Sequence, residues 1–310
     1  MIINEKEILP GQERVTKVGI SKLPSHTSID ISITVYRSEN PGPVLLLLGG
    51  MHGDEINGVE IVRRLIESDH NKVKRGTTIC IPILNVYGFI HFSRTVPDGK
   101  DVNRSFPGNK NGSLASRMAN YVVKDIIPKI DYGIDFHTGG AQRTNYPQTR
   151  CVMKDEENRK LAEAFGAPFA LNSQFRSNSL RWSASKLGKR ILVYEGGEST
   201  RFDEFAIEQG VSGALRVMKH LDMIDEAPEP TALRQVVQSS SWIRARNAGL
   251  FQPMVNSGDS VGKNQVVGYL TDPFGEKKQP VKTKVAGYVI GLNNNPLLHQ
   301  GDAIMHIGVV

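Results

Sequence analysis

Apolar residues fall into short runs along the first two thirds of the chain, and these runs differ in their spacing. Residues 29–36, IDISITVY, alternate apolar and polar positions, which predicts a strand with one buried face. Other runs are continuously apolar and bounded by turn residues, a pattern typical of strands covered on both faces. These runs are 43–50 (PVLLLLGG), 77–85 (TTICIPILN), 132–140 (YGIDFHTGG) and 190–198 (RILVYEGGE).

Segments with a helical pattern separate these runs. They are 58–68 (GVEIVRRLIES), 114–127 (LASRMANYVVKDII), 155–165 (DEENRKLAEAF) and 203–221 (DEFAIEQGVSGALRVMKHL). Strands that alternate with helices build layered sheets, so the pattern predicts an α/β fold in which a sheet is flanked by helices.

The pattern changes near residue 225. Residues 225–232, DEAPEPTA, are polar and contain two prolines, as linkers do. Beyond them lie short strand-like pieces and many glycines, without a convincing helix. Residues 249–270 and 287–308 echo one another weakly, since each places a proline ahead of a Gly-Asp turn followed by alternating residues. We therefore predict an α/β domain at 1–225 and a small all-β, barrel-like domain at 232–310.

Composition narrows the class of protein. The chain of 310 residues is 39% hydrophobic and 23% charged, which is ordinary for a globular protein. Its net charge of +6 suits an anionic partner, but no basic run reaches five, so we expect no nucleic-acid binding. Cys80 and Cys151 are too few for a disulfide framework and are expected to be reduced thiols. The N-terminus has no apolar signal region and no run approaches 18 apolar residues, which predicts a cytoplasmic protein without membrane contact.

The ends of the predicted strands carry the candidate chemistry. His52 and Glu55 follow the four-leucine run, and His137 and Glu195 lie near the ends of two later strands. In an α/β sheet, ligands collect at the carboxyl ends of strands. Two imidazoles and one carboxylate form a typical catalytic zinc set that leaves a fourth position open. Taken singly, Asp54 and Glu55 also suit the positive end of the following helix, and His137 suits an ordinary hydrogen-bonded histidine.

Four motifs together resemble the succinylglutamate desuccinylase/aspartoacylase family, a branch of the zinc carboxypeptidase-like hydrolases. They are GGMHGDE at 49–55, SRTVPDGKDVNRSFPG at 93–108, DFHTGG at 135–140 and YEGG at 194–197. The resemblance covers most of residues 43–220 in the family's motif order. It implies a zinc-carboxypeptidase-like mixed sheet, and the trailing β-barrel of family members would account for 232–310.

The resemblance implies one zinc ion per chain, held by His52, Glu55 and His137. Zinc lowers the pKa of a bound water towards about 7 and polarises an amide carbonyl. The resemblance also implies Glu195 as the general base that takes a proton from the attacking water, a role that suits a carboxylate. Glu198 is the rival for this role, although only Glu195 directly follows the apolar strand.

The second motif contains three further residues with implied roles. Arg94 lies where the family places an arginine that stabilises the oxyanion, and its alternative is an ordinary solvent-facing loop residue. Asn103 and Arg104 resemble the pair that holds the substrate carboxylate, a task that suits the forked donors of arginine. Asp101 is expected to brace their loop.

These features predict a zinc-dependent amidohydrolase, a deacylase that cleaves the amide bond of an N-acyl amino acid or a similar small amide. A carboxypeptidase acting on peptides uses the same chemistry and remains an alternative. A carrier of the lipoyl or biotinyl type is suggested by the echoed hairpins, but Lys277 and Lys278 lack a Met-Lys-Met or Asp-Lys-Ala context. The sequence leaves open the acyl group, the amine, a homo-oligomeric state and the arginine that contacts the substrate among Arg143, Arg150, Arg176 and Arg181.

Overall fold

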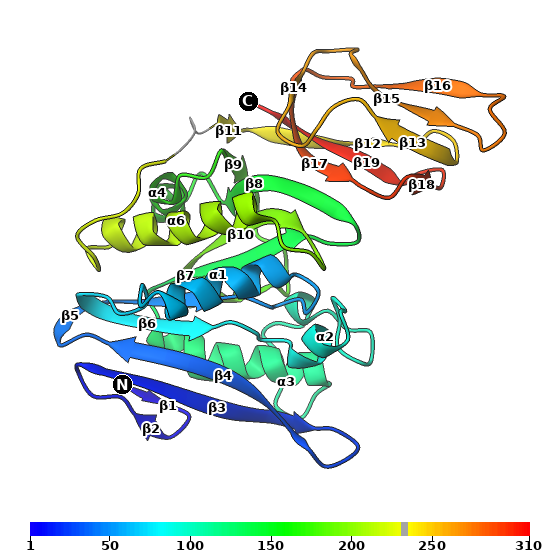
Figure 1. Ribbon diagram of the computed structural model, residues 1–310. Helices are drawn as coiled ribbons and strands as arrows, with labels where there is room; N and C mark the ends of the chain where they lie inside the picture. The colour runs from blue at the N-terminus through cyan, green and yellow to red at the C-terminus, as the bar shows by residue number, and fades with distance from the viewer. Residues whose placement is uncertain (231–234) are drawn as a thin grey trace.

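A computed structural model describes residues 1–230 and 235–310 of the chain (Figure 1). Its main element is a 13-stranded mixed sheet. The strands of this sheet are β3 (Gln12–Lys22), β4 (Ser28–Arg37), β5 (Asn40–Leu48), β6 (Arg75–Ile81), β7 (Tyr132–Gly139), β8 (Arg143–Cys151), β9 (Phe169–Asn172), β10 (Arg190–Glu198), β11 (Gln235–Val237), β12 (Ser239–Arg244), β14 (Ser260–Val261), β17 (Gly287–Asn293) and β19 (Ala303–Val309).

The main path through this sheet runs β12-β19-β17-β8-β10-β7-β5-β6-β4-β3. The four central strands β10, β7, β5 and β6 are parallel to one another, so their carboxyl ends meet at one edge. Strands β8 and β4 pair antiparallel with the two edges of this centre, β17 then pairs antiparallel with β8, and β3 pairs antiparallel with β4. A separate two-stranded sheet near the N-terminus consists of β1 (Ile2–Ile3) and β2 (Lys6–Glu7).

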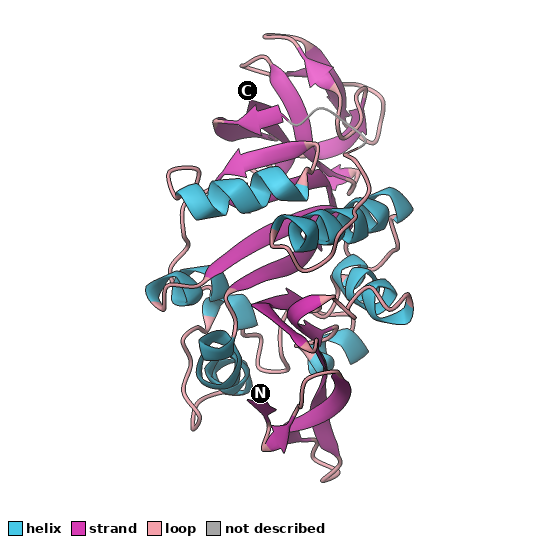
Figure 2. Ribbon diagram, turned by 90° about the vertical axis from the view of Figure 1, so that its left-hand side faces the viewer, coloured by secondary structure: helices cyan, strands magenta, loops and turns pink. Residues whose placement is uncertain are grey.

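Helices cover both faces of the large sheet (Figure 2). They are α1 (Ile56–Glu67), α2 (Val86–Ile90), α3 (Leu114–Tyr121), α4 (Glu156–Phe165), α5 (Leu180–Lys186) and α6 (Glu204–His220). The predicted helix at 114–127 begins as α3 but continues as a π-helical turn over Val122–Ile126. No helix in the described part of the chain combines the length and apolar character that a membrane crossing requires.

The four-leucine run is buried on both faces, as its pattern predicted. Leu45 and Leu47 belong to the core beneath α1, α4 and α6, whereas Leu46 and Leu48 belong to the core beneath α2, α3 and α5. None of the four is more than 1% exposed. Each buried leucine contributes about 1.5 to 3 kcal/mol relative to an exposed one, so this strand is a rigid platform for the loop that follows it.

The five predicted strands correspond to β4, β5, β6, β7 and β10. The strand predicted at 77–85 ends earlier, at Ile81, since Pro82 has no N–H to offer the ladder. The predicted helices correspond to α1, α3, α4 and α6, so the chain has the mixed α/β fold that the sequence predicted. Cys80 and Cys151 are buried thiols, also as predicted.

Residues 235–310 contain strands and no helix in the described part of the chain. A four-stranded sheet in this segment has the order β16-β15-β13-β18. Its strands are β13 (Gly249–Pro253), β15 (Val266–Thr271), β16 (Lys278–Lys282) and β18 (Leu297–Leu298). The two echoed sequences, 249–270 and 287–308, each contribute a short strand to the other. Strand β14 (Ser260–Val261) of the first pairs with β17 of the second, and β18 of the second pairs with β13 of the first.

The C-terminal strands continue the sheet of the preceding α/β part. Strand β17 pairs antiparallel with β8, with Gly291 opposite Asn145, and β11 pairs parallel with β9. Main-chain hydrogen bonds therefore join residues 235–310 to the α/β part. Residues 231 and 232 of the predicted linker lie outside the described residues.

Candidate active site

The loop after β5 carries two of the predicted metal ligands, His52 and Glu55. Gly50 has a φ of +55°, a left-handed conformation that favours glycine. A Cβ on Gly53 would lie 1.8 Å from the carbonyl carbon of Gly88, so only glycine allows the loop to approach α2 this closely. Glu55 precedes α1 but makes no side-chain capping hydrogen bond, and its carboxylate faces the neighbouring strand β7 instead.

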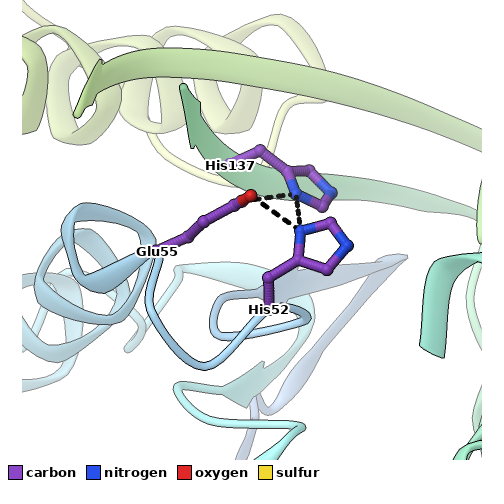
Figure 3. A group of neighbouring side chains, drawn as sticks. All are labelled: His52, Glu55 and His137. Carbon is purple, nitrogen blue, oxygen red and sulfur yellow. Dashed lines mark hydrogen bonds and ion pairs between the residues drawn. The ribbon is translucent and has the colours of Figure 1, made fainter. Parts of the chain in front are cut away.

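His52, Glu55 and His137 converge on one point (Figure 3). The Nδ1 atoms of His52 and His137 lie 2.8 Å from the two carboxylate oxygens of Glu55, Oε1 and Oε2 respectively. The two Nδ1 atoms are 3.2 Å apart. All three side chains are buried, and one ligand atom from each lies within 4.8 Å of the others. The structure thus brings together the three residues that the sequence predicted as zinc ligands.

Two aspartates hold the outer nitrogens of these imidazoles. Nε2 of His52 lies 3.1 Å from Asp101 Oδ1, and Nε2 of His137 lies 2.9 Å from Asp135 Oδ2. An ionised carboxylate only accepts hydrogen bonds, so each Nε2 donates its proton to its aspartate, and each Nδ1 faces the shared point, where a bound metal would take the place of the Nδ1 proton. Carboxylates commonly orient metal-binding histidines in this way. No role was predicted for Asp135, although the D-x-H spacing puts it on the same strand face as His137.

The charges around this point favour a cation. Burial alone lowers the pKa of His137, but Asp135 and Glu55 raise it well above its usual value. Burial alone raises the pKa of Glu55, but His52 and His137 lower it well below its usual range. The pocket of carboxylates therefore stabilises positive charge between the imidazoles. Two nitrogen donors and one oxygen donor at this spacing fit a zinc ion.

Arg94 lies beside the convergence point, with its side chain 38% exposed. Its Nη1 donates to Glu55 Oε1 at 2.9 Å, and its Nε and Nη2 lie 3.1 and 3.0 Å from Asp101 Oδ2. Asp101 also accepts a hydrogen bond from the backbone N–H of Asn103 at 2.7 Å, which fits its expected bracing role. One carboxylate thus links the arginine, the loop and His52.

Asn103 and Arg104 form a 3₁₀ turn over Val102–Arg104 and line the same cavity as the three ligands. Asn103 Oδ1 accepts a hydrogen bond from the backbone N–H of Leu180 at 3.0 Å, the first residue of α5. The Nη1 of Arg104 donates to the carbonyl of Asn103 at 2.6 Å, and the side chain forms no salt bridge in the described part of the chain. Its guanidinium is therefore available to an anion.

Glu195 lies on β10 directly opposite His137 on β7. Neighbouring strands are about 4.8 Å apart and in-register residues share a face, so the carboxylate stands beside the ligand group. Arg150 Nη1 lies 3.1 Å from Glu195 Oε1, and Asn145 Nδ2 donates to Oε2. Both partners come from the polar strand β8; Arg150 was predicted only as a possible substrate contact, and Asn145 was not predicted.

Glu198, the rival of Glu195, faces another way. Its backbone pairs with Gly139 after an irregularity in β10, and its side chain accepts a hydrogen bond from Asn294 Nδ2 at 2.8 Å. Arg201 Nε lies 3.6 Å from the same carboxylate. Glu195 lines the cavity that contains the three ligands, and Glu198 is not among its lining residues.

That cavity has a volume of about 410 Å³ and a positive lining. Three acidic residues, Glu55, Asp135 and Glu195, face six arginines. The arginines are Arg94, Arg104, Arg143, Arg150, Arg176 and Arg181. All four arginines that the sequence left unassigned therefore line the site. A cavity with this imbalance attracts an anionic ligand.

Trp242 brings the C-terminal strands into the cavity wall. This residue lies on β12 and stacks on His306 of β19, with ring centroids 4.5 Å apart and an interplanar angle of 6°. The guanidinium carbon of Arg143 lies 5.8 Å from the centroid of the Trp242 ring, within the range of a cation–π contact. Residues from both predicted domains thus line one cavity.

A comparison with known protein families assigns the chain to one of them. Residues 41–221 match the family model described as the succinylglutamate desuccinylase/aspartoacylase catalytic domain. The chain belongs to this family, as its motifs predicted.

Individual relatives extend the likeness to nearly the whole chain. N-alpha-acetyl-L-2,4-diaminobutyric acid deacetylase of Halomonas elongata is 28% identical over 337 aligned positions, covering 97% of each protein. The crystal structure of a succinylglutamate desuccinylase/aspartoacylase from Rhodobacter sphaeroides is 26% identical with a TM-score of 0.85, covering 96% of this chain and 94% of that one. The product-bound structure of the ectoine utilization protein EutE (DoeB) from Ruegeria pomeroyi shares the fold, with 23% identity, a TM-score of 0.86 and coverage of 98% and 97%.

Proposed function

We propose that this protein is a zinc-dependent deacylase that hydrolyses the amide bond of an N-acyl amino acid or a similar small amide. The observation that carries the proposal is the convergence of His52, Glu55 and His137 beside the carboxylate of Glu195, at the base of one arginine-lined cavity. This is the donor set and carboxylate base expected of a zinc carboxypeptidase-like hydrolase.

In this proposal one zinc ion per chain is held by His52, Glu55 and His137. When bound, zinc supplies Lewis acidity, which makes a water acidic enough to attack at neutral pH and polarises the amide carbonyl. Asp101 and Asp135 keep the proton on the far nitrogen of each imidazole, so that the near nitrogens remain ligands.

Glu195 acts as the general base in this proposal. Its carboxylate takes a proton from the attacking water and later delivers it to the nitrogen of the departing amine. Arg150 and Asn145 hold both carboxylate oxygens from the side of β8, which limits the rotation of the side chain. A base with few accessible rotamers loses little entropy when the reaction begins.

We assign the arginines of the cavity two roles, stabilising charge at the reacting bond and binding charged groups of the substrate. In this proposal Arg94, which contacts Glu55, donates to the oxygen that becomes negative as the carbonyl is attacked. Arg104 and Asn103, which line the cavity, bind the α-carboxylate of the amino acid. Arg143 and Arg176, which form no salt bridge among the described residues, remain for a second polar group.

The substrate class follows from the cavity and from the relatives. A space of about 410 Å³ with a cationic lining suits a small anionic amide. The relative from Halomonas elongata is named as a deacetylase of an acetylated diamino acid, which makes an acetyl group one candidate. A peptide substrate is the alternative. Trp242 of the C-terminal part stands in the cavity wall, which favours a small molecule over an extended chain.

A substrate screen tests the proposal. The zinc-loaded protein is incubated with acetyl, succinyl and formyl derivatives of amino acids, including Nα-acetyl-2,4-diaminobutyrate, and the free amine is measured. We expect release from at least one N-acyl amino acid, with a rate that falls when the substrate is extended into a peptide. Faster cleavage of peptides would favour the carboxypeptidase, and no release from any amide would contradict the deacylase.

A further inference from the structure

A second cavity lies within the C-terminal strands, apart from the His-Glu-His group. It has a volume of about 740 Å³, larger than that of the first cavity. Strands β12 and β16 form much of its wall, and each is the edge strand of its own sheet (Figure 1). The two sheets therefore do not close on one another at this place, which leaves an opening into the space between them.

We propose that this cavity is a binding site for a small amphipathic anion, a molecule with an apolar body and one carboxylate or similar negative group. The proposal goes beyond the deacylase reaction and does not depend on it. The volume of this second cavity lies within the range of about 300 to 1,000 Å³ that is usual for small-molecule pockets.

The lining suits the apolar body of such a ligand. Leu270 lines the cavity and is buried, and Ile243, Val281 and Val285 are partly buried against the same core. Ala245 is also part of the lining. Burial of an alkyl chain against these side chains removes apolar surface from water, which favours binding.

The charged residues of the lining suit the anionic group. Four basic side chains line the cavity, Arg244, Arg246, Lys282 and Lys284, and no acidic residue does. Arg244 Nη1 donates to the carbonyl of Gly301 at 2.9 Å. None of the four forms a salt bridge with a described residue. These four side chains are exposed, and four cations beside an apolar space favour a ligand whose negative group stays near solvent while its apolar body enters the cavity.

Trp242 makes binding at this site observable. It lines the second cavity as well as the first. A ligand in the second cavity changes the surroundings of this indole and hence its fluorescence. The chain has two tryptophans, so Trp182→Phe leaves Trp242 as the only indole.

The test uses octanoate as the probe and octan-1-ol as its uncharged partner, on the full chain carrying Trp182→Phe. Fluorescence and titration calorimetry are read together. We expect saturable binding of octanoate and at least tenfold weaker binding of octanol. The double variant Lys282→Glu/Lys284→Glu should weaken octanoate at least tenfold, whereas Lys110→Glu/Lys219→Glu, two exposed lysines elsewhere, should leave its affinity unchanged.

Several results would overturn the proposal. Absence of saturable octanoate binding in the calorimeter is one, and equal affinity for octanol is another, because the cavity would then be an apolar void without charge selectivity. Loss of binding in Arg104→Ala, but not in the Lys282/Lys284 variant, would place octanoate in the first cavity. Self-association of the chain that the Lys282/Lys284 variant abolishes would assign the cavity to an interface between copies.

Discussion

Replacement of Glu195 by Gln tests the proposed general base most directly. The change keeps the size of the side chain and an amide that can still form hydrogen bonds, but it removes the ability to accept a proton from water. Glu195 is 15% exposed and pairs with Arg150, which is 29% exposed. The variant also leaves this guanidinium without its charged partner.

The size of the effect follows from these two losses. General-base catalysis typically contributes about 10²- to 10⁴-fold to the rate. That factor corresponds to about 3 to 5 kcal/mol in the activation free energy. Loss of a hydrogen bond to a charged group costs about 1.5 to 3 kcal/mol of folding stability, so the variant should unfold at a lower temperature but still fold. We expect a fall mainly in kcat if the contacts of Arg104 with substrate survive.

Glu198→Gln is the matched control. Glu198 is buried, Glu195 is partly buried, and both accept hydrogen bonds, but Glu198 contacts Asn294 and does not line the cavity. The measurements are kcat, KM, bound zinc and thermal unfolding for both variants on the substrate that the screen identifies. Zinc content should remain near one per chain in both. If Glu195→Gln keeps full activity and Glu198→Gln loses it, the base is Glu198. If both variants keep full activity, catalysis by a carboxylate base is refuted.

Three further predictions concern the metal site and the C-terminal part. His137→Ala removes one of three ligands and should cost most of the bound zinc, and full occupancy by elemental analysis would contradict the ligand assignment. Asp135→Asn leaves all three ligands in place but weakens the orientation of His137, so zinc affinity measured by competition with a chelator should fall about 10- to 100-fold. An unchanged affinity would refute the orienting role. Limited proteolysis should cleave first near the predicted linker, because residues 225, 226 and 228–230 are exposed and belong to no helix or strand. The two fragments should then elute together, since β17 pairs with β8, and a folded C-terminal fragment that separates or shows helical circular dichroism would contradict this architecture.

Much of the α/β part could be predicted from local patterns, for a physical reason. A strand buried on both faces must be apolar throughout, and the leucines of β5 meet that condition within their own few residues. A helix that packs on a sheet must repeat its apolar positions every three to four residues, as α1 and α6 do. The D-x-H-T-G and H-x-x-E motifs work at the same short range, so the ligand set was also visible.

Strands β3 and β8 were not predicted, because their burial depends on segments that are distant in the sequence. Strand β3 is an edge strand with most of its residues exposed, so it has little apolar periodicity. Strand β8 is polar and contains a proline, yet Gln148 and Thr149 are buried because β10 and β9 lie on either side of them. The hydropathy of a residue does not show which other segments of the chain will cover it.

The sequence by itself therefore determined the central strands, the main helices, the family and the three candidate zinc ligands, since each rests on residues close together in the chain. Only the tertiary structure decided which side chains surround them. The contacts of Asp101 with His52, of Arg150 with Glu195 and of Trp242 with Arg143 join segments about 45 to 100 residues apart. Such contacts depend on strand order and register, which arise from the packing of the whole sheet and leave no periodic trace in the chain.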